Sequence, residues 1–148
     1  MTAPDISVRS LQRKIPFNVA ALQDFAVKAM RKCLQLHKQK HKDTDLRKLH
    51  EVFVWLISDQ RMVSLHRKFM HQTGPTDVLT FQHGEIFISV ESARRNARLF
   101  GNSLARELRL YVIHGLLHLH GFDDRTRPEA RKMQRTQEEI LRHCSGAL

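Results

Sequence analysis

Hydrophobic positions near the start of the chain alternate first as in a strand and then as in a helix. Ile6 and Val8 are separated by polar neighbours, which predicts a half-buried strand that ends before Pro16. From Asn18, which can serve as an N-cap, apolar residues recur at intervals of three and four as far as Leu34. The pattern therefore predicts a strand followed by an amphipathic helix.

A second strand and helix are expected in the middle of the chain, after a polar, cation-rich connector over residues 38–48. Residues 52–57 form a short apolar run rich in aromatic and β-branched side chains, as in a central strand. Ser58 or Asp59 can cap the next helix, which should end before Pro75 because the residue before a proline avoids the helical region.

The remaining elements are two strands followed by three helices. Residues 77–81 and 85–89 read as strands joined by a short connection, and we expect them to pair antiparallel. Helices are predicted over 90–99, closed by Gly101, over 103–120, closed by Gly121, and over 128–143. The pattern predicts an α+β fold, with a small mixed β-sheet of about four strands packed against several α-helices.

Length and composition support one globular domain over residues 1–148. The chain is 41% hydrophobic and 27% charged, which is enough apolar material for a single core and does not suggest disorder. Lys and Arg total 25 against 15 Asp and Glu, a formal net charge of +10. Such an excess predicts an anionic partner.

No stretch approaches the length of a membrane helix, and the first residues lack a secretory pattern, so a cytoplasmic protein with no membrane partner is expected. Cys33 and Cys144 lie far apart without Cys-x-x-Cys spacing. We interpret them as ordinary thiols rather than a disulfide framework or a zinc ribbon.

The most informative segment lies at the end of the helix that Gly121 closes. His114 and His118 are four residues apart, so both imidazoles lie on one helix face and can reach one metal ion. Gly121 can adopt a positive φ and stop the helix, and Asp124 can then turn back to offer a carboxylate as third ligand. The segment predicts a metal site made of His114, His118 and Asp124.

This spacing matches that of the metzincin zinc peptidases except at two positions. Gly115 stands where a peptidase has its water-activating Glu, which disfavours a peptidase. Asp124 stands in place of a third histidine and adds a negative charge and a harder ligand. One Zn²⁺ is the first choice, and Mn²⁺ or another divalent cation that prefers oxygen ligands is the alternative.

Three alternatives stay open from the residues alone. The two histidines could be a satisfied pair in the core rather than ligands. His120 lies off their face, which favours a surface role or a role behind the ligands. Asp123, next to Asp124, could be the ligating aspartate.

Three motifs together resemble the YbeY endoribonuclease family of rRNA maturation factors. Residues 114–123 agree with the family signature His-Gly-x-x-His-x-x-Gly-[Phe/Tyr]-Asp. Residues 75–81, Pro-Thr-Asp-Val-Leu-Thr-Phe, are similar to its Pro-Thr-Asp-Val-Leu-Ser-Phe, and residues 84–89 are similar to its Gly-Asp-Ile-x-Ile-Ser. The motifs occur in the order and spacing of the family.

The resemblance implies a single-strand-specific metallo-endoribonuclease that acts in 16S rRNA 3′-end maturation and late ribosome quality control. It implies rRNA and the ribosome as partners, together with a ribosomal protein or a ribosome-associated GTPase. The family holds its metal with three histidines, of which this chain keeps His114 and His118 and replaces the third by Asp124. A family Tyr-Arg pair aligns with Phe69 and Met70, so the arginine is missing.

Hydrolysis of RNA requires a nucleophile and stabilisation of charge on the phosphate. His114 and His118 are expected to act through a metal-bound water, although the 2′-hydroxyl of the RNA is an alternative nucleophile. The sequence identifies no general base, and His83, Glu85 and His120 are the candidates.

A group of arginines at helical spacing could contact phosphates or simply form a solvated surface. These residues are Arg94, Arg95, Arg98, Arg106 and Arg109. For Thr76 and Asp77, a turn-to-strand junction and a place in the cleft are equally supported. The main alternative to the nuclease is a non-catalytic ribosome assembly factor with a structural metal, and a metallopeptidase ranks third.

Overall fold

The computed structural model describes residues 3–37, 45–70 and 77–145, without the side chain of Met70. Its strands are β1 (Asp5–Ser10), β2 (Glu51–Ile57), β3 (Val78–Phe81) and β4 (Glu85–Ser89), and its helices are α1 (Val19–Leu34), α2 (Asp59–Met70), α3 (Val90–Phe100), α4 (Leu104–Leu119) and α5 (Arg127–Cys144), with a 3-10 turn at Leu46–Lys48. The predicted elements are confirmed, and apart from the end of α2, which adjoins residues outside the described part, their ends differ from the predictions by one or two residues.

The four strands form one mixed sheet in the order β1-β2-β4-β3. β1 pairs parallel with β2, and β2 pairs parallel with β4. β3 pairs antiparallel with β4 through the short turn that joins them, and it forms one edge of the sheet. The prediction of an α+β fold with a four-stranded mixed sheet is confirmed.

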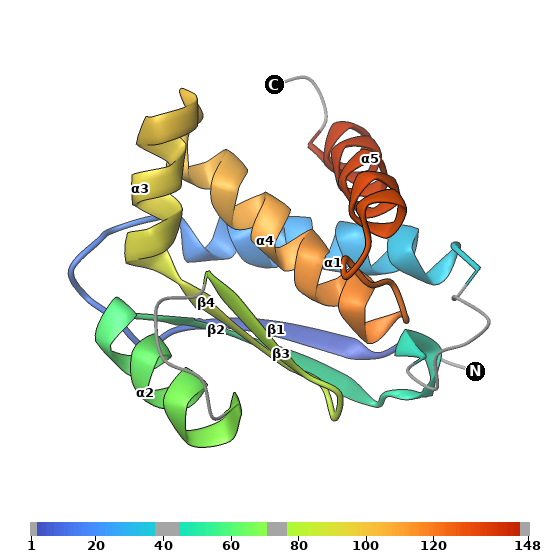
Figure 1. Ribbon diagram of the computed structural model, residues 1–148, viewed down its shortest axis with the longest axis horizontal. Coiled ribbons are helices and arrows are strands. Elements are labelled where there is room, and N and C mark those ends of the chain that lie inside the picture. Colours follow the sequence, from blue (N-terminus) through green and yellow to red (C-terminus); the bar gives the residue numbers. More distant parts are fainter. Residues whose placement is uncertain (1–2, 38–44, 71–76, 146–148) are drawn as a thin grey trace.

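The two faces of the sheet are covered differently (Figure 1). α1, α3, α4 and α5 all lie on one face, called here the helix face, while α2 lies alone on the other, called the outer face. Alternate strand residues, among them Val54, Ile86 and Ile88, are fully buried in the main core. The outer face has a smaller core of Ile57, Met62 and Leu79.

α4 lies directly on β4 at Gly115. A Cβ atom built at this glycine would stand 2.6 to 2.9 Å from three side-chain carbons of Ile86, closer than packed carbons approach. Glycine is therefore needed for the close approach of helix and sheet. The contact fixes the height of His114 and His118 above β4.

Side-chain caps begin the helices where the sequence predicts them. Asn18 accepts a hydrogen bond from the Ala21 amide at the start of α1, and Ser58 accepts one from Arg61 in α2. Ser103 does the same for Arg106 in α4. Residues 38–44 and 71–76 lie outside the described part, so the expected helix end before Pro75 is not tested.

The two cysteines are buried free thiols, as predicted. Burial raises the pKa of Cys33 to about 12, which leaves it inert at neutral pH. Within the described ranges, no helix has the length and apolar character needed to cross a membrane.

Candidate metal centre

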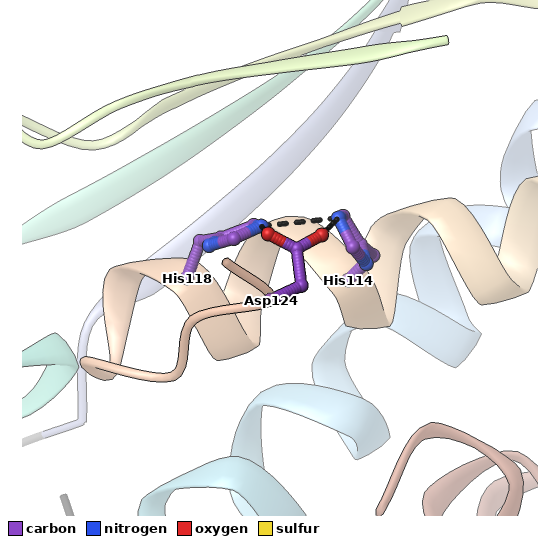
Figure 2. A group of neighbouring side chains, drawn as sticks. All are labelled: His114, His118 and Asp124. Carbon is purple, nitrogen blue, oxygen red and sulfur yellow. Dashed lines mark hydrogen bonds and ion pairs between the residues drawn. The ribbon is translucent and has the colours of Figure 1, made fainter. Parts of the chain in front are cut away.

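The C-terminal half of α4 and the loop after it bring three side chains together (Figure 2). The Nε2 atoms of His114 and His118 are 3.0 Å apart. Gly121 has a φ of 91°, which ends the helix and turns the chain back. The Asp124 carboxylate then lies 3.8 Å from Nε2 of His114 and 3.9 Å from Nε2 of His118.

These distances fit a tetrahedral metal site. Bonds of about 2.0 to 2.1 Å at tetrahedral angles place neighbouring ligand atoms about 3.4 Å apart. The three side chains have separations on either side of that value, and each offers one ligand atom within 4.8 Å of the others. Small side-chain movements would therefore close the set around one ion.

Hydrogen bonds orient both imidazoles toward the same point. Nδ1 of His114 lies 2.6 Å from Oε1 of Gln137 on α5, and Nδ1 of His118 lies 3.1 Å from the carbonyl oxygen of Phe122. Both oxygens are acceptors, so each Nδ1 carries the proton and each Nε2 presents a lone pair. Two lone pairs 3.0 Å apart repel each other unless a cation or a proton lies between them, and this donor set fits a metal ion.

The electrostatic setting also favours a neutral imidazole at His118. Burial, followed by the charge of His114 when that residue is protonated, lowers the pKa of His118 below its usual value. Asp124 and the Phe122 carbonyl act in the opposite direction but do not outweigh these effects. His118 is therefore unprotonated at neutral pH, as metal binding requires.

The structure distinguishes the two neighbouring aspartates. Asp124 faces the histidines, whereas Asp123 accepts a hydrogen bond from the Asp124 amide and lies 3.3 Å from Nε of Arg125. Asp124 is thus the aspartate that the structure brings to the predicted site.

The site opens into a cavity of about 330 Å³ between α4 and the edge strand β3. Its wall includes Val78 and Thr80 of β3, together with Gln82 in the turn that follows. A neighbouring hollow that also contains His114 is lined by Asp77 and Tyr111. Substrate can therefore approach the histidines along β3.

None of the three candidate bases lies in this cavity. His83 and Glu85 contact each other at 2.6 Å, and Glu85 lies on the outer face of the sheet. His120 is 0% exposed, and its Nε2 lies 2.7 Å from the Leu36 carbonyl oxygen, beyond the end of α1. A surface role for His120 is therefore wrong, because the last turn of α4 directs it into the core.

Asp77, the described residue before β3, has both of the roles expected for it. Thr76 lies outside the described residues. Asp77 accepts a hydrogen bond from Asn96, which also donates to the Tyr111 hydroxyl at 2.6 Å. Burial raises the pKa of Tyr111 to about 12, so the hydroxyl beside the His114 hollow keeps its proton. Asp77 is a junction residue and also lines the cleft.

Most of the predicted phosphate-binding arginines are used within the fold. Arg95 binds Asp59, Arg106 binds Glu138, and Arg109 lies over the ring of Phe25. Two other cations are closer to the cavity. Arg125 lines it, and Nζ of Lys132 lies 5.7 Å from the centre of the Phe122 ring.

Position 115 explains the departure from a zinc peptidase. A Glu there would collide with Ile86 on the buried side of α4.

Gln137 is the functional residue that sequence reasoning missed, because it belongs to α5 and no motif connects it to His114. Its position on an amphipathic helix is compatible with any half-buried polar role.

Comparison with known proteins identifies relatives over most of the chain. A family model described as Endoribonuclease YbeY matches residues 7–145. A protein named Endoribonuclease YbeY from Frankia casuarinae is 34% identical over 119 residues, which cover 67% of this chain and 59% of that protein. A chloroplastic Endoribonuclease YBEY from Arabidopsis thaliana is 31% identical over 93% of this chain but only 26% of its own length. The match thus spans less than two thirds of either relative.

The fold also matches a solved structure. The solution structure of the TM1509 protein from Thermotoga maritima superimposes with a TM-score of 0.60 at 27% sequence identity. The match covers 92% of this chain and 89% of the other. The arrangement of sheet and helices is therefore shared with a protein of known structure.

Proposed function

This chain belongs to the YbeY endoribonuclease family, and from that premise we propose that it is a single-strand-specific metallo-endoribonuclease of 16S rRNA 3′-end maturation and late ribosome quality control. The observation that carries the proposal is the convergence of His114, His118 and Asp124, with both Nε2 atoms turned toward one point beside a cavity. We expect it to act in the cytoplasm on rRNA in the ribosome, with a ribosomal protein or a ribosome-associated GTPase as partner.

His114, His118 and Asp124 would hold one divalent cation. Zn²⁺ suits the two imidazoles, and the carboxylate also makes Mn²⁺ acceptable. Such an ion supplies a Lewis acid that polarises a phosphoryl oxygen and makes water more acidic. Gln137 and the Phe122 carbonyl would keep the ligand nitrogens unprotonated.

The surrounding residues are suited to placing a phosphodiester at this point. Arg125, although paired with Asp123, and Lys132 place cationic groups beside the cavity, where the backbone phosphates of a single strand would approach. Tyr111 stays protonated beside the His114 hollow, where its hydroxyl accepts a hydrogen bond from Asn96. The cavity's described lining contains no uncommitted base, so attack by the 2′-hydroxyl remains as consistent with the geometry as attack by water.

The test combines metal content with RNA cleavage. Purified protein is expected to carry one metal ion per chain by mass spectrometry and to cut single-stranded rRNA. His114→Ala and Asp124→Ala should lose both the ion and the cleavage, because each removes one of three ligands. Asp124→His, which restores a third imidazole, should keep the ion. Asp123→Asn is the matched control for metal content, since Asp123 pairs with Arg125 and is not among the three grouped ligand residues.

Two outcomes would contradict the proposal. If the wild type holds metal but does not cut RNA, the ion is structural and the protein acts as an assembly factor. If cleavage is unchanged in His114→Ala, the activity does not come from this centre.

A further inference from the structure

A second concave surface lies on the outer face of the sheet, on the side away from α4. It is a groove of about 630 Å³ between α2 and β4. Apolar side chains form much of its lining, namely Ile57, Leu65, Phe69 and Phe87. Arg61 and Lys68 of α2 also line it. The groove therefore combines an apolar surface with cations from one helix.

Aromatic rings continue from this groove across the outer face. Phe69 and Phe81 contact edge to face at 5.6 Å, and Phe81 contacts Phe87 in the same way. Trp55 lies opposite Phe87 in the register of β2 and β4, and its ring stacks on Phe53 at 5.5 Å. Phe69 is 50% exposed although large apolar side chains are usually buried. The face thus presents a set of rings, of which Phe69 is half exposed and has Nζ of Lys68 5.4 Å from its ring centre.

Among the described residues, the edge strand β3 separates this face from the candidate metal centre. Val78 and Thr80 point to the helix face and line the cavity beside His114. Phe81, with the opposite orientation, belongs to the aromatic set. A flexible strand that enters the metal cavity along β3 can therefore pass over the sheet edge to the groove without crossing the core.

Charge on the outer face is divided in a way that favours an anion at the groove. Asp5 and Glu51 pair in register at the far end of the sheet from α2. Glu85 accepts a hydrogen bond from the Trp55 indole and contacts His83. The acidic groups are therefore distant or engaged, while Arg61 and Lys68 remain at the groove.

Asp59, at the start of α2, is also engaged. Its carboxylate lies 2.6 Å from a guanidinium nitrogen of Arg95 and accepts a hydrogen bond from Ser89. Exposed rings beside cations are the features with which sheet surfaces bind single-stranded nucleic acid, because bases stack on rings and phosphates pair with cations.

We infer that the groove between α2 and β4 is a second RNA-binding subsite of the enzyme. A base of the single strand stacks on Phe69 over the apolar floor, and Arg61 and Lys68 contact the adjoining phosphates. The subsite holds the strand at a distance from the bond that is cut, so it contributes affinity and register rather than chemistry. The inference rests on the proposed function for the identity of the substrate as RNA.

Trp55 provides a direct readout, because it is the single tryptophan of the chain and belongs to the aromatic set. The probe is a single-stranded 2′-O-methyl oligonucleotide of about 12 nucleotides, within the range of known single-strand sites. Binding is followed by fluorescence anisotropy of a labelled probe and by quenching of Trp55. Neither readout requires cleavage, so failure of the proposed chemistry and failure of the subsite can be distinguished.

Ring and charge are tested separately. Phe69→Leu keeps an apolar side chain but removes the ring, and should weaken binding about 5- to 100-fold, whereas Phe69→Tyr should bind like the wild type. Arg61→Ala with Lys68→Ala should weaken binding and reduce the slope of log affinity against log salt by about 1.4. The matched control is Lys28→Ala with Arg31→Ala, which removes two exposed cations from α1 on the helix face.

The inference is overturned if Phe69→Leu and the Arg61/Lys68 variant bind as tightly as the wild type. It is also overturned if the control pair weakens binding equally, since the effect would then be one of net charge. A further test adds an acidic amphipathic peptide. If the peptide quenches Trp55 but does not displace the RNA, the groove is assigned to a protein partner instead. Weakened binding in the groove variants, with the Lys28→Ala and Arg31→Ala control binding normally, supports the subsite whether or not the wild type cuts RNA.

Discussion

Replacing Gly115 by alanine tests whether close helix-to-sheet packing positions the metal centre. The new methyl group would stand 2.6, 2.7 and 2.9 Å from Cγ2, Cδ1 and Cγ1 of Ile86. All three atoms belong to one fully buried, β-branched side chain with little freedom to rotate. Either Ile86 must leave its rotamer or α4 must move away from β4.

The expected magnitude follows from two opposing effects. Overpacking of a core by one methyl group costs about 1 to 3 kcal/mol. Alanine in a helix interior is favoured over glycine by about 1 kcal/mol, which offsets part of that cost. We therefore expect Gly115→Ala to lower the free energy of unfolding by up to about 2 kcal/mol. Metal affinity should fall as well, because His114 adjoins the displaced position.

A double-mutant cycle gives the decisive measurement. Ile86→Ala alone should destabilise the protein by about 2 to 5 kcal/mol, since it leaves a cavity. In the double variant the methyl at position 115 occupies that space, and urea unfolding should show a favourable coupling of about 1 to 3 kcal/mol. Ile86→Val removes only one of the three close carbons, so it should relieve much less of the overpacking caused by Gly115→Ala than Ile86→Ala does. Strict additivity of Gly115→Ala and Ile86→Ala would refute the reasoning.

Two further predictions concern residues that support the site and the start of α2. Gln137→Leu removes the acceptor of the His114 Nδ1 proton and should weaken metal binding about 10- to 100-fold in a competition assay with a chelating dye, while Gln137→Glu keeps an acceptor and should bind far better. Although burial raises the pKa of Asp59, hydrogen bonds from Arg95 and Ser89 outweigh it and hold that pKa below 3.8. The stabilisation that these hydrogen bonds give is complete above pH 3.8, the ordinary pKa of Asp, and is lost as the pH falls through the lowered pKa of Asp59. Arg95→Ala should therefore reduce the free energy of unfolding in urea by about 1 kcal/mol at pH 7 and by less below pH 3.8. An equal loss at both pH values would contradict this assignment.

The fold could be predicted largely because its signals are local. Asn18, Ser103 and Gly121 mark helix ends through hydrogen bonds and backbone angles within a few residues. The antiparallel pairing of β3 with β4 followed from their short connection. The order of the parallel strands could not be predicted in this way, because the pairing of β1 with β2 and of β2 with β4 depends on contacts between distant segments.

The candidate metal site could be predicted from the sequence for the same reason, since its three side chains follow from one helical repeat and one glycine. Gln137 was not accessible, because it reaches His114 from another helix. His120 is not in the ligand group, as expected, but the surface role suggested for it was wrong, because a local pattern does not show its contact with the Leu36 carbonyl beyond α1. The choice between Asp123 and Asp124 likewise depended on the path of the chain after Gly121.

The confinement of the ligands to residues 114–124 has a consequence for how the protein folds. These side chains meet once a helical turn and a reversal have formed, an event of low contact order that precedes slow long-range pairing such as that of Asp5 with Glu51. A cation can thus be captured by a chain that has not yet assembled its sheet. Because an ion that also binds the incompletely folded chain favours the native state less, the metal would guide the folding of α4 more than it raises the final stability.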